Sequence, residues 1–365
     1  MKKIYTCTTK SFKAGEHFHM RDTGLIAKCL RSLGVESKCI MPLPAHPEDL
    51  DLPLIRVEYK KLEDPAWWRS LHIDGVYLYS WGAVKYTLVA RAIRKAGIKL
   101  AIHMDFGGDL YPIEKVSLYR WLLSFAGNII RSIHLGYADY ISTSPYAAQN
   151  FAKSILYGRR IADKIKVMPA PVAPHFKLKS GEQREKKVVV VGRWSDERMD
   201  QVKRPQYMMD VARILAEKNP TVKVEIYGRI GNGVQSTYDG LSSEVQERVH
   251  LMGYAFNEDL PLVYNRAQVS FCPSYSESTH IASAESMCCG CSVVVPPTPR
   301  LRVLQWYTTH ESGSIAAEDT PEAMADAILH ELKLWEEGKR NPEEISSYWQ
   351  NIFHADKALK RIFEL

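Results

Sequence analysis

Two glutamates, Glu277 and Glu285, stand eight positions apart in a setting that suggests chemistry. Glu277 follows a Pro-Ser pair at 273–274, and Glu285 lies in a segment that reads as a helix ending at Gly290. Apolar runs at 269–272 and 291–295 predict strands on either side. Both carboxylates would then lie near the carboxyl end of a strand, where doubly wound sheets bind ligands.

The start of this expected helix would suit a phosphate group. The first N–H groups of a helix lack partners within it and carry partial positive charge. Glu285, about one and a half turns into the helix, would accept hydrogen bonds from ribose hydroxyls. Glu277 would meet hydroxyls of a sugar beyond the phosphates. The residues expected to present the N–H groups are Ser278, Thr279, His280 and Ile281.

The segment resembles a known family of enzymes, the retaining GT-B glycosyltransferases of the family 4 type. Their signature is a Glu, seven residues, a second Glu, a helix end of small residues, a Gly and a Val-rich strand. Residues 277–295 read ESTHIASAESMCCGCSVVV. The family usually has an aromatic residue and then Gly where this chain has Thr279 and His280. His280 therefore puts a side chain where the backbone should approach the phosphates closely.

The resemblance implies two cations for the donor diphosphate. The family has an Arg after the first strand of its second domain and a Lys at the next helix start. Here a valine run at 188–191 leads to Arg193, and Lys203 follows at an expected helix start. Arg offers a fork of donors and Lys a point charge. Arg198 and Arg204 are alternatives for the same role.

The resemblance also implies the substrate and the reaction. Gly192 would adjoin the donor nucleotide, whose base would lie against the segment from Met252 to Tyr254. UDP is the favoured nucleotide and UDP-glucose the first choice of donor, with no metal or other cofactor. The transfer would retain the anomeric configuration, with a saccharide or lipid-linked hydroxyl acceptor in polysaccharide or glycolipid synthesis.

In the first half of the chain the resemblance points to His103, at the end of an expected strand, 99–103. A His at this position faces the donor sugar in many family members, so His103 is assigned to a sugar hydroxyl. A packed, hydrogen-bonded His at a sheet end is the alternative. Gly15, in the loop after the first strand, is carried over as a further site residue. Asp105 and Asp109 are nearby alternatives to His103 for this role, although they are expected to cap the helix that follows.

These residues are positioned by short apolar runs that alternate with helical patterns. The alternation predicts parallel sheets built from strand–helix–strand units, and hence an α/β fold with two doubly wound, Rossmann-like domains facing a cleft. Prolines followed by a polar stretch at 175–187 mark the boundary. The expected parts are an acceptor-side domain at 1–176, a nucleotide-sugar domain at 177–341, and a C-terminal helix at 342–365 that packs back on the first domain.

Composition agrees with a globular enzyme. The chain has 365 residues, a formal net charge of +6 and seven cysteines. The modest charge does not indicate a nucleic-acid partner, and the odd number of cysteines suits a reducing compartment. No leader or membrane-spanning segment is expected, so a cytoplasmic location is predicted. The helix expected at 113–134 could rest on the inner membrane face, although an ordinary core-facing helix is the alternative.

Other functions fit the sequence less well. A GT-B nucleotide-sugar epimerase and a non-catalytic subunit that binds a sugar nucleotide are the main alternatives. The glycine-rich run at 228–233 lacks the dinucleotide-binding spacing and is not expected to start a helix. Asp49 and Asp51 imitate a metal-binding Asp-x-Asp motif but lie in a proline-rich loop.

Overall fold

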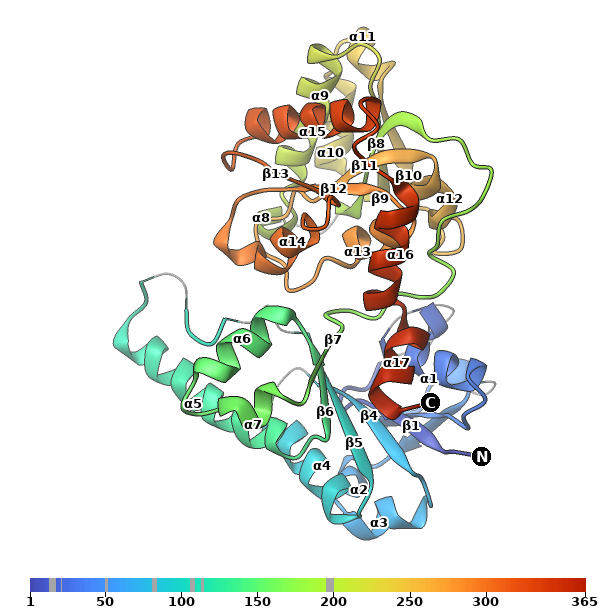
Figure 1. Ribbon diagram of the computed structural model, residues 1–365, viewed down its shortest axis with the longest axis vertical. Coiled ribbons are helices and arrows are strands. Elements are labelled where there is room, and N and C mark those ends of the chain that lie inside the picture. Colours follow the sequence, from blue (N-terminus) through green and yellow to red (C-terminus); the bar gives the residue numbers. More distant parts are fainter. Residues whose placement is uncertain are drawn as a thin grey trace. The chain divides into compact units, whose positions relative to one another are not determined.

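The computed structural model describes residues 1–12, 18–20, 22–49, 52–80, 84–105, 109–112, 115–194 and 200–365. Contacts divide the chain into two units (Figure 1). The first unit comprises Met1–Ala173 and Ile352–Leu365, and the second comprises Pro174–Asn351. The division precedes the expected boundary at 176 because Phe176 packs in the second unit, its ring 6.2 Å from that of Tyr264.

The first unit contains a parallel sheet of seven strands among the described residues, in the order β3-β2-β1-β4-β5-β6-β7. The order reverses between β1 and β4, as in doubly wound folds. The strands are β1 (Ile4–Cys7), β2 (Cys39–Pro42), β3 (Leu54–Val57), β4 (Gly75–Ser80), β5 (Lys99–Met104), β6 (Tyr140–Thr143) and β7 (Ile165–Val167).

The longest helix of this unit is α5 (Leu118–Gly136), which starts later than the expected residue 113. The hydroxyl of Ser117 accepts a hydrogen bond from the Arg120 amide at 3.4 Å and caps the helix there. Residues 113 and 114 lie outside the described part of the chain. The other helices are η1 (Phe18–Met20), α1 (Asp22–Ser32), η2 (Pro47–Asp49), α2 (Tyr59–Leu62), α3 (Pro65–Ser70), α4 (Val84–Lys95), α6 (Pro145–Lys153), α7 (Gly158–Ala162) and α17 (Ala355–Phe363).

The second unit repeats the plan with six described parallel strands in the order β10-β9-β8-β11-β12-β13. The order reverses between β8 and β11. Right-handed connections therefore place the helices that follow β8 and those that follow β11 on opposite faces of the sheet. The strands are β8 (Glu185–Trp194), β9 (Lys223–Ile230), β10 (Val249–Gly253), β11 (Ala267–Phe271), β12 (Ser292–Val295) and β13 (Gly313–Ile315).

The helices of the second unit include α10 (Asn232–Asp239), which begins directly after Gly231. The expectation that no helix follows the glycine-rich run was therefore wrong, because Gly231, in an extended conformation, serves as the residue before the first turn. The other helices are α8 (Asp200–Lys203), α9 (Pro205–Lys218), α11 (Ser243–Gln246), α12 (Leu260–Asn265), α13 (Ile281–Cys288), η4 (Pro299–Leu301), α14 (Arg302–Tyr307), α15 (Pro321–Glu336) and α16 (Pro342–Phe353).

The tail beyond residue 342 forms two helices, α16 and α17, where the sequence predicted one. His354 interrupts them with a non-helical backbone. The Val172 amide donates to the Phe353 carbonyl at 2.8 Å, and the Ala355 amide donates to the Val172 carbonyl at 3.0 Å. This small bridge holds the break, and α17 packs against α1 in the first unit (Figure 1).

Candidate active site

The residues singled out in the second unit lie at its switch point. Arg193 is near the end of β8, and Glu277 is in the loop after β11. β8 and β11 pair in parallel, so their carboxyl ends meet at one edge of the sheet. In open α/β sheets this edge, beside the reversal of strand order, is where ligands bind.

Glu277 is held by Lys203 and Ser274. The Lys203 ammonium forms an ion pair with Oε1 of Glu277, and the Ser274 hydroxyl donates to the same oxygen at 2.9 Å. Burial alone would raise the pKa of Glu277, but His280, Lys203 and Ser274 outweigh it and lower the pKa. Glu277 is therefore a carboxylate at neutral pH, paired with Lys203.

Arg204 anchors the loop that carries Glu277. Its Nε donates to the Pro273 carbonyl at 2.6 Å, and its guanidinium pairs with Asp319 at 2.7 Å. The guanidinium also stacks on the Tyr207 ring, 3.9 Å from the centroid. With these donors engaged inside the unit, Arg204 positions the loop. The sequence suggested only a diphosphate role for it, since nothing local reveals a bond to a carbonyl 69 positions away.

Helix α13 begins at Ile281, immediately after this loop. His280 precedes it with φ of 40° and ψ of 81°, in the left-handed region that favours glycine. The first helical amide with an intrahelical bond is that of Ser283, which donates to the His280 carbonyl at 3.1 Å. The N–H groups of Ile281 and Ala282 precede it at the positive end of the helix.

The His280 side chain is turned into the unit. It is buried, and its Nδ1 lies 2.8 Å from the Ser283 hydroxyl. Burial lowers the pKa of His280 to about 4, although Glu277 partly opposes the effect. His280 is therefore neutral at physiological pH. Thr279 beside it is also buried, and its carbonyl accepts a hydrogen bond from the Tyr307 hydroxyl at 2.6 Å. Ser278 stays half-buried.

Glu285 lies in the middle of α13 and is buried. Burial is the main cause of the raised pKa of Tyr264 on α12, and the negative charge of Glu285 raises it further. Glu285 is thus a buried carboxylate beside an aromatic hydroxyl, about one turn after the helix start at Ile281.

An exposed aromatic and apolar group lies at the end of β10 and in the residues after it. Met252 and Tyr254, the residues predicted for a base, are joined by Phe256, which the sequence analysis did not select. The rings of Tyr254 and Phe256 lie 5.5 Å apart at 85°, and about half of each side chain is exposed. Large apolar side chains exposed together beside a strand end suit a flat ring ligand.

Gly192 has a structural reason to be glycine. An added Cβ would lie 2.5 Å from the Trp194 side chain, whose indole donates to the Tyr227 carbonyl at 2.9 Å. Its partner across the sheet, Gly228, has φ of +130°, and a Cβ there would come within 1.8 Å of the Gly192 carbonyl oxygen. The neighbouring Arg193 is exposed.

In the first unit, His103 is fully buried at the end of β5. Its Nδ1 lies 3.0 Å from the Tyr77 hydroxyl and 3.2 Å from the Ser142 hydroxyl, and its ring stacks on Tyr79 at 4.4 Å. Its Nε2 has no partner among the described residues. Burial lowers the pKa of His103 to about 3, so the ring is neutral.

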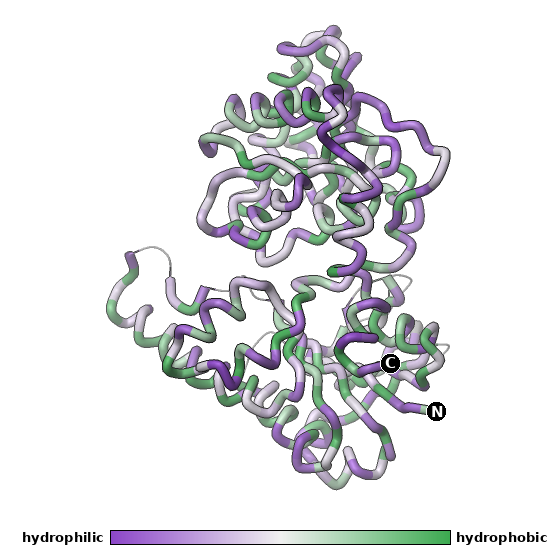
Figure 2. Tube along the Cα trace, in the orientation of Figure 1, coloured by the Kyte–Doolittle hydropathy of each residue, from purple (hydrophilic) through white to green (hydrophobic). Residues whose placement is uncertain are grey.

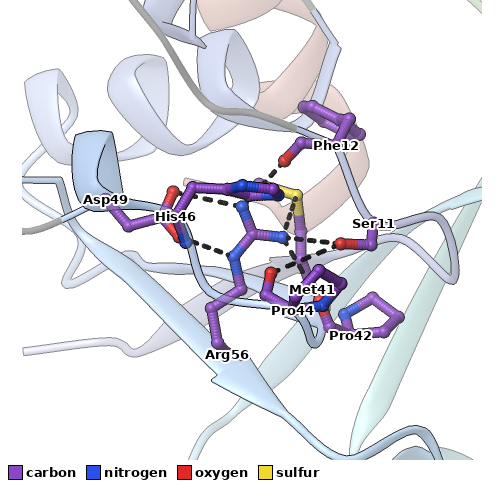
Figure 3. A network of polar contacts seen from close by, with 8 residues as sticks. All are labelled: Ser11, Phe12, Met41, Pro42, Pro44, His46, Asp49 and Arg56. Atoms are coloured by element: carbon purple, nitrogen blue, oxygen red, sulfur yellow. Dashed lines mark hydrogen bonds and ion pairs between the residues drawn. The ribbon is translucent and has the colours of Figure 1, made fainter.

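Asp49, the first acid of the Asp-x-Asp-like motif, has a structural role (Figure 3). Asp49 pairs with Arg56 through two bonds of 2.9 and 3.1 Å and accepts the His46 amide at 2.8 Å. Arg56 also donates to the Phe12 carbonyl at 2.7 Å, so the pair ties three loop segments together. The bond to Arg56 is the main reason that the pKa of Asp49 is lowered. Asp51 lies outside the described residues.

Two other predicted residues, Gly15 and Arg198, also lie outside the described residues. All seven cysteines are described, and each is a buried thiol outside any disulfide. Cys291 Sγ lies 3.0 Å from the Tyr264 carbonyl. No group of His, Cys, Asp and Glu in the described chain could hold a metal ion.

Comparison with known proteins agrees with the fold. Residues 185–333 match the family model described as Glycosyl transferases group 1. No relative is found among curated protein sequences.

Solved structures match over both units. A glycosyltransferase from Rickettsia africae is 15% identical with a TM-score of 0.67, covering 100% of this chain and 97% of that one. Anabaena HepE in complex with UDP-glucose is 16% identical with a TM-score of 0.62, covering 100% and 99%. A putative UDP-N-acetylglucosamine 2-epimerase from Listeria monocytogenes is 13% identical with a TM-score of 0.57, covering 100% and 95%.

The parallel sheets of both units match those of GT-B enzymes, and the second unit carries the family domain around Glu277 and Glu285. The chain therefore has the GT-B fold, and residues 185–333 of its second unit match the Glycosyl transferases group 1 family.

Proposed function

We propose that this protein is a glycosyltransferase that moves a sugar from a nucleoside diphosphate sugar to a hydroxyl acceptor, with retention of anomeric configuration. One observation carries the proposal. An ion pair joins Lys203, at the end of α8, to Glu277, in the loop that leads into α13 at the switch point of the second sheet. A cation for phosphate, a carboxylate for sugar hydroxyls and a helix start are thus adjacent.

The donor nucleotide is assigned to the second unit. Lys203 and Arg193, with the first amides of α13 after Ser278, Thr279 and His280, would hold the diphosphate. Negative charge develops there as the sugar leaves, so fixed positive charge lowers the barrier. Glu285 would bind the ribose. The base would lie on Met252 and Tyr254, with Phe256 extending that surface, and Gly192 would keep the end of β8 open to the nucleotide.

The transferred sugar is assigned to Glu277 and His103. Ionised Glu277 accepts hydrogen bonds from sugar hydroxyls, and neutral His103 donates or accepts one through Nε2, according to its tautomer. These residues orient the sugar. The acceptor hydroxyl would attack from the face the diphosphate leaves, and the leaving phosphate oxygen would take the acceptor proton. One glycosidic bond breaks and one forms.

We further propose that the reaction needs no metal ion, because Lys203, Arg193 and the helix start supply the positive charge that a divalent cation would otherwise bring. UDP-glucose is the proposed donor, supported by the bound UDP-glucose in Anabaena HepE. The acceptor is proposed to be a saccharide or lipid-linked hydroxyl in polysaccharide or glycolipid synthesis. Seven cysteines outside any disulfide support a cytoplasmic location.

Calorimetric titration with UDP, GDP, ADP and NAD in EDTA tests the donor assignment. UDP should bind without metal, and Glu285→Ala should weaken it at least tenfold. Glu244→Ala, which removes an exposed carboxylate from α11, is the matched control. Tight binding of GDP or ADP would keep the site and change the nucleotide. Equal UDP binding by Glu285→Ala and wild type would contradict the assignment.

The epimerase alternative has support from the Listeria neighbour and needs its own measurement. An epimerase would convert UDP-N-acetylglucosamine without an acceptor, whereas a transferase should release UDP faster when an acceptor is added. A protein that binds UDP yet turns over no UDP-sugar with any saccharide or lipid-linked acceptor would be the non-catalytic subunit.

A further inference from the structure

Helix α5 in the first unit buries two polar side chains. Asn128 accepts a hydrogen bond from the Tyr157 hydroxyl at 2.8 Å, and His134 lies 2.9 Å from the Ser80 hydroxyl. Asn128 and His134 are buried. A surface helix of a globular protein ordinarily turns its apolar side inward.

The outward side of α5 is apolar along most of the helix. Leu118, Leu122, Ile129 and Ile133 recur at helical spacing on one face, and their exposed fractions run from 37% to 73%. Tyr119, Trp121 and Leu123 add exposed area beside this face near the start of the helix. Hydrophobic colour recurs along the helix in Figure 2. Leu118, Leu122, Ile129 and Ile133 are called the outer face below.

A contiguous exposed surface of this kind marks a binding interface. The helix has 19 residues, about 28 Å in length. In the described part of the chain, no helix is both long and apolar enough to cross a bilayer. An apolar face of this length can instead lie in the plane of a membrane surface, with its apolar side chains among the acyl chains.

The charge at the start of the helix favours lipid over protein. Lys115 and Arg120 are exposed there, and residues 115–138 contain no Asp or Glu. Two copies of this face paired about a twofold axis would bring like charges together with no acid in the segment to neutralise them. Anionic headgroups supply the missing negative charge. Trp121 also stacks on Phe125 at 5.7 Å, and aromatic rings favour the lipid–water interface.

We propose that the outer face of α5 docks the enzyme on an anionic membrane surface. The inference is independent of the donor assignment, because it uses no residue of the nucleotide site. It extends the proposed function by bringing the enzyme to the surface where a lipid-linked acceptor would reside.

Vesicle co-sedimentation of the full chain tests this proposal. Wild type should bind vesicles of phosphatidylcholine with 30% phosphatidylglycerol, more weakly at 0.5 M salt, and bind pure phosphatidylcholine poorly. Leu118→Asp/Leu122→Asp should lower binding to anionic vesicles at least tenfold. Arg120→Gln should lower it about fivefold, the value of one basic residue near such a surface.

Ile315→Asp is the matched control, since Ile315 is similarly exposed, at 44%, on β13 of the other unit. It should bind vesicles like wild type, and UDP affinity should be unchanged in every variant. Absent binding of wild type to anionic vesicles would overturn the proposal, as would equal binding by the double variant. A concentration-dependent dimer that the double variant abolishes, without vesicle binding, would assign the face to a second copy instead.

Discussion

The candidate residues of the two parallel sheets differ in charge. At the β8–β11 edge, the half-buried carboxylate of Glu277 faces the ammonium of Lys203. At the end of β5, His103 is uncharged and is held by the hydroxyls of Tyr77 and Ser142. The first arrangement suits a ligand with formal charge, and the second suits neutral hydroxyls.

The largest effect is expected when the ion pair between Lys203 and Glu277 is broken. Lys203→Met would leave Glu277 without its cation and the diphosphate without a positive charge. Turnover, measured as UDP release from UDP-glucose, should fall about 10²–10³-fold. Lys203→Arg, which keeps the charge, should recover part of the rate.

Lys186→Met is the control for this prediction, because Lys186 forms a more exposed pair with Glu336 at 2.6 Å in the same unit. Exposed pairs contribute little, so its rate should match wild type. A folded Lys203→Met protein within threefold of wild type would show that Lys203 does not stabilise the leaving group.

Substitution of the neutral His103 should reduce activity less. His103→Asn removes the Nε2 group proposed for a sugar hydroxyl, so kcat/KM for UDP-glucose should fall about tenfold, equivalent to one hydrogen bond of about 1.4 kcal/mol. Calorimetric affinity for UDP alone should not change. Ser142→Ala, which alters only the support of the ring, should stay within threefold. A parallel loss of UDP affinity would assign His103 to the nucleotide.

Acid should destabilise the region around His103. The pKa of His103 is about 3 and that of His134 about 4, whereas an unfolded His titrates near 6.5. Between these values the unfolded chain binds more protons, so stability is full above about pH 6.5 and falls as the pH drops. Each His should cost about 2 kcal/mol between pH 7 and 5.

Urea unfolding at pH 7 and pH 5 measures this effect, and His103→Asn should show a smaller loss between the two than wild type. Glu277, with its lowered pKa, is ionised throughout this window and should add nothing. An unchanged pH dependence in His103→Asn would mean that the ring is protonated in the folded protein.

The smallest expected effect concerns His280. His280→Gly relieves a left-handed backbone, worth about 1–2 kcal/mol, and loses the contact with Ser283, worth about 1 kcal/mol. Stability in urea should therefore change by no more than about 1 kcal/mol, and UDP affinity by less than threefold. Ser283→Ala loses the contact alone and should be the less stable variant. A fivefold loss of UDP affinity in His280→Gly would show that the imidazole itself contacts phosphate.

The strands and the helix that carry the candidate site of the second unit could be predicted from sequence. A valine run, glutamates at a fixed spacing and a closing glycine are short-range patterns, and β8, α13 and β12 lie where they indicate. The left-handed His280 also agrees with the glycine of the resembling family. The fold class followed from the alternation of strands and helices, and both sheets confirm it.

Contacts between distant residues could not be predicted. In the sequence, nothing distinguishes Arg204 from other surface cations. Its contacts with the Pro273 carbonyl and Asp319 appear only in the structure. β3 was missed because it follows a proline-rich stretch, and its pairing with β2 decides its structure. The apolar positions of α5 were visible in sequence, but periodicity alone does not say which side of a helix faces the protein.

The return of the C-terminal residues to the first unit has a consequence for proteolysis and for gene design. The backbone passes between the units twice, after Ala173 and within α16. A single nick at 177–184 would leave the second unit covalently joined to α17 through α16. The two fragments should stay associated because α17 packs on α1, and they should separate only in denaturing gels. A gene truncated after residue 173 would lack α17 and expose the side of α1 that it covers. Independent expression of the first unit therefore calls for a circular permutation that fuses residues 352–365 ahead of residue 1.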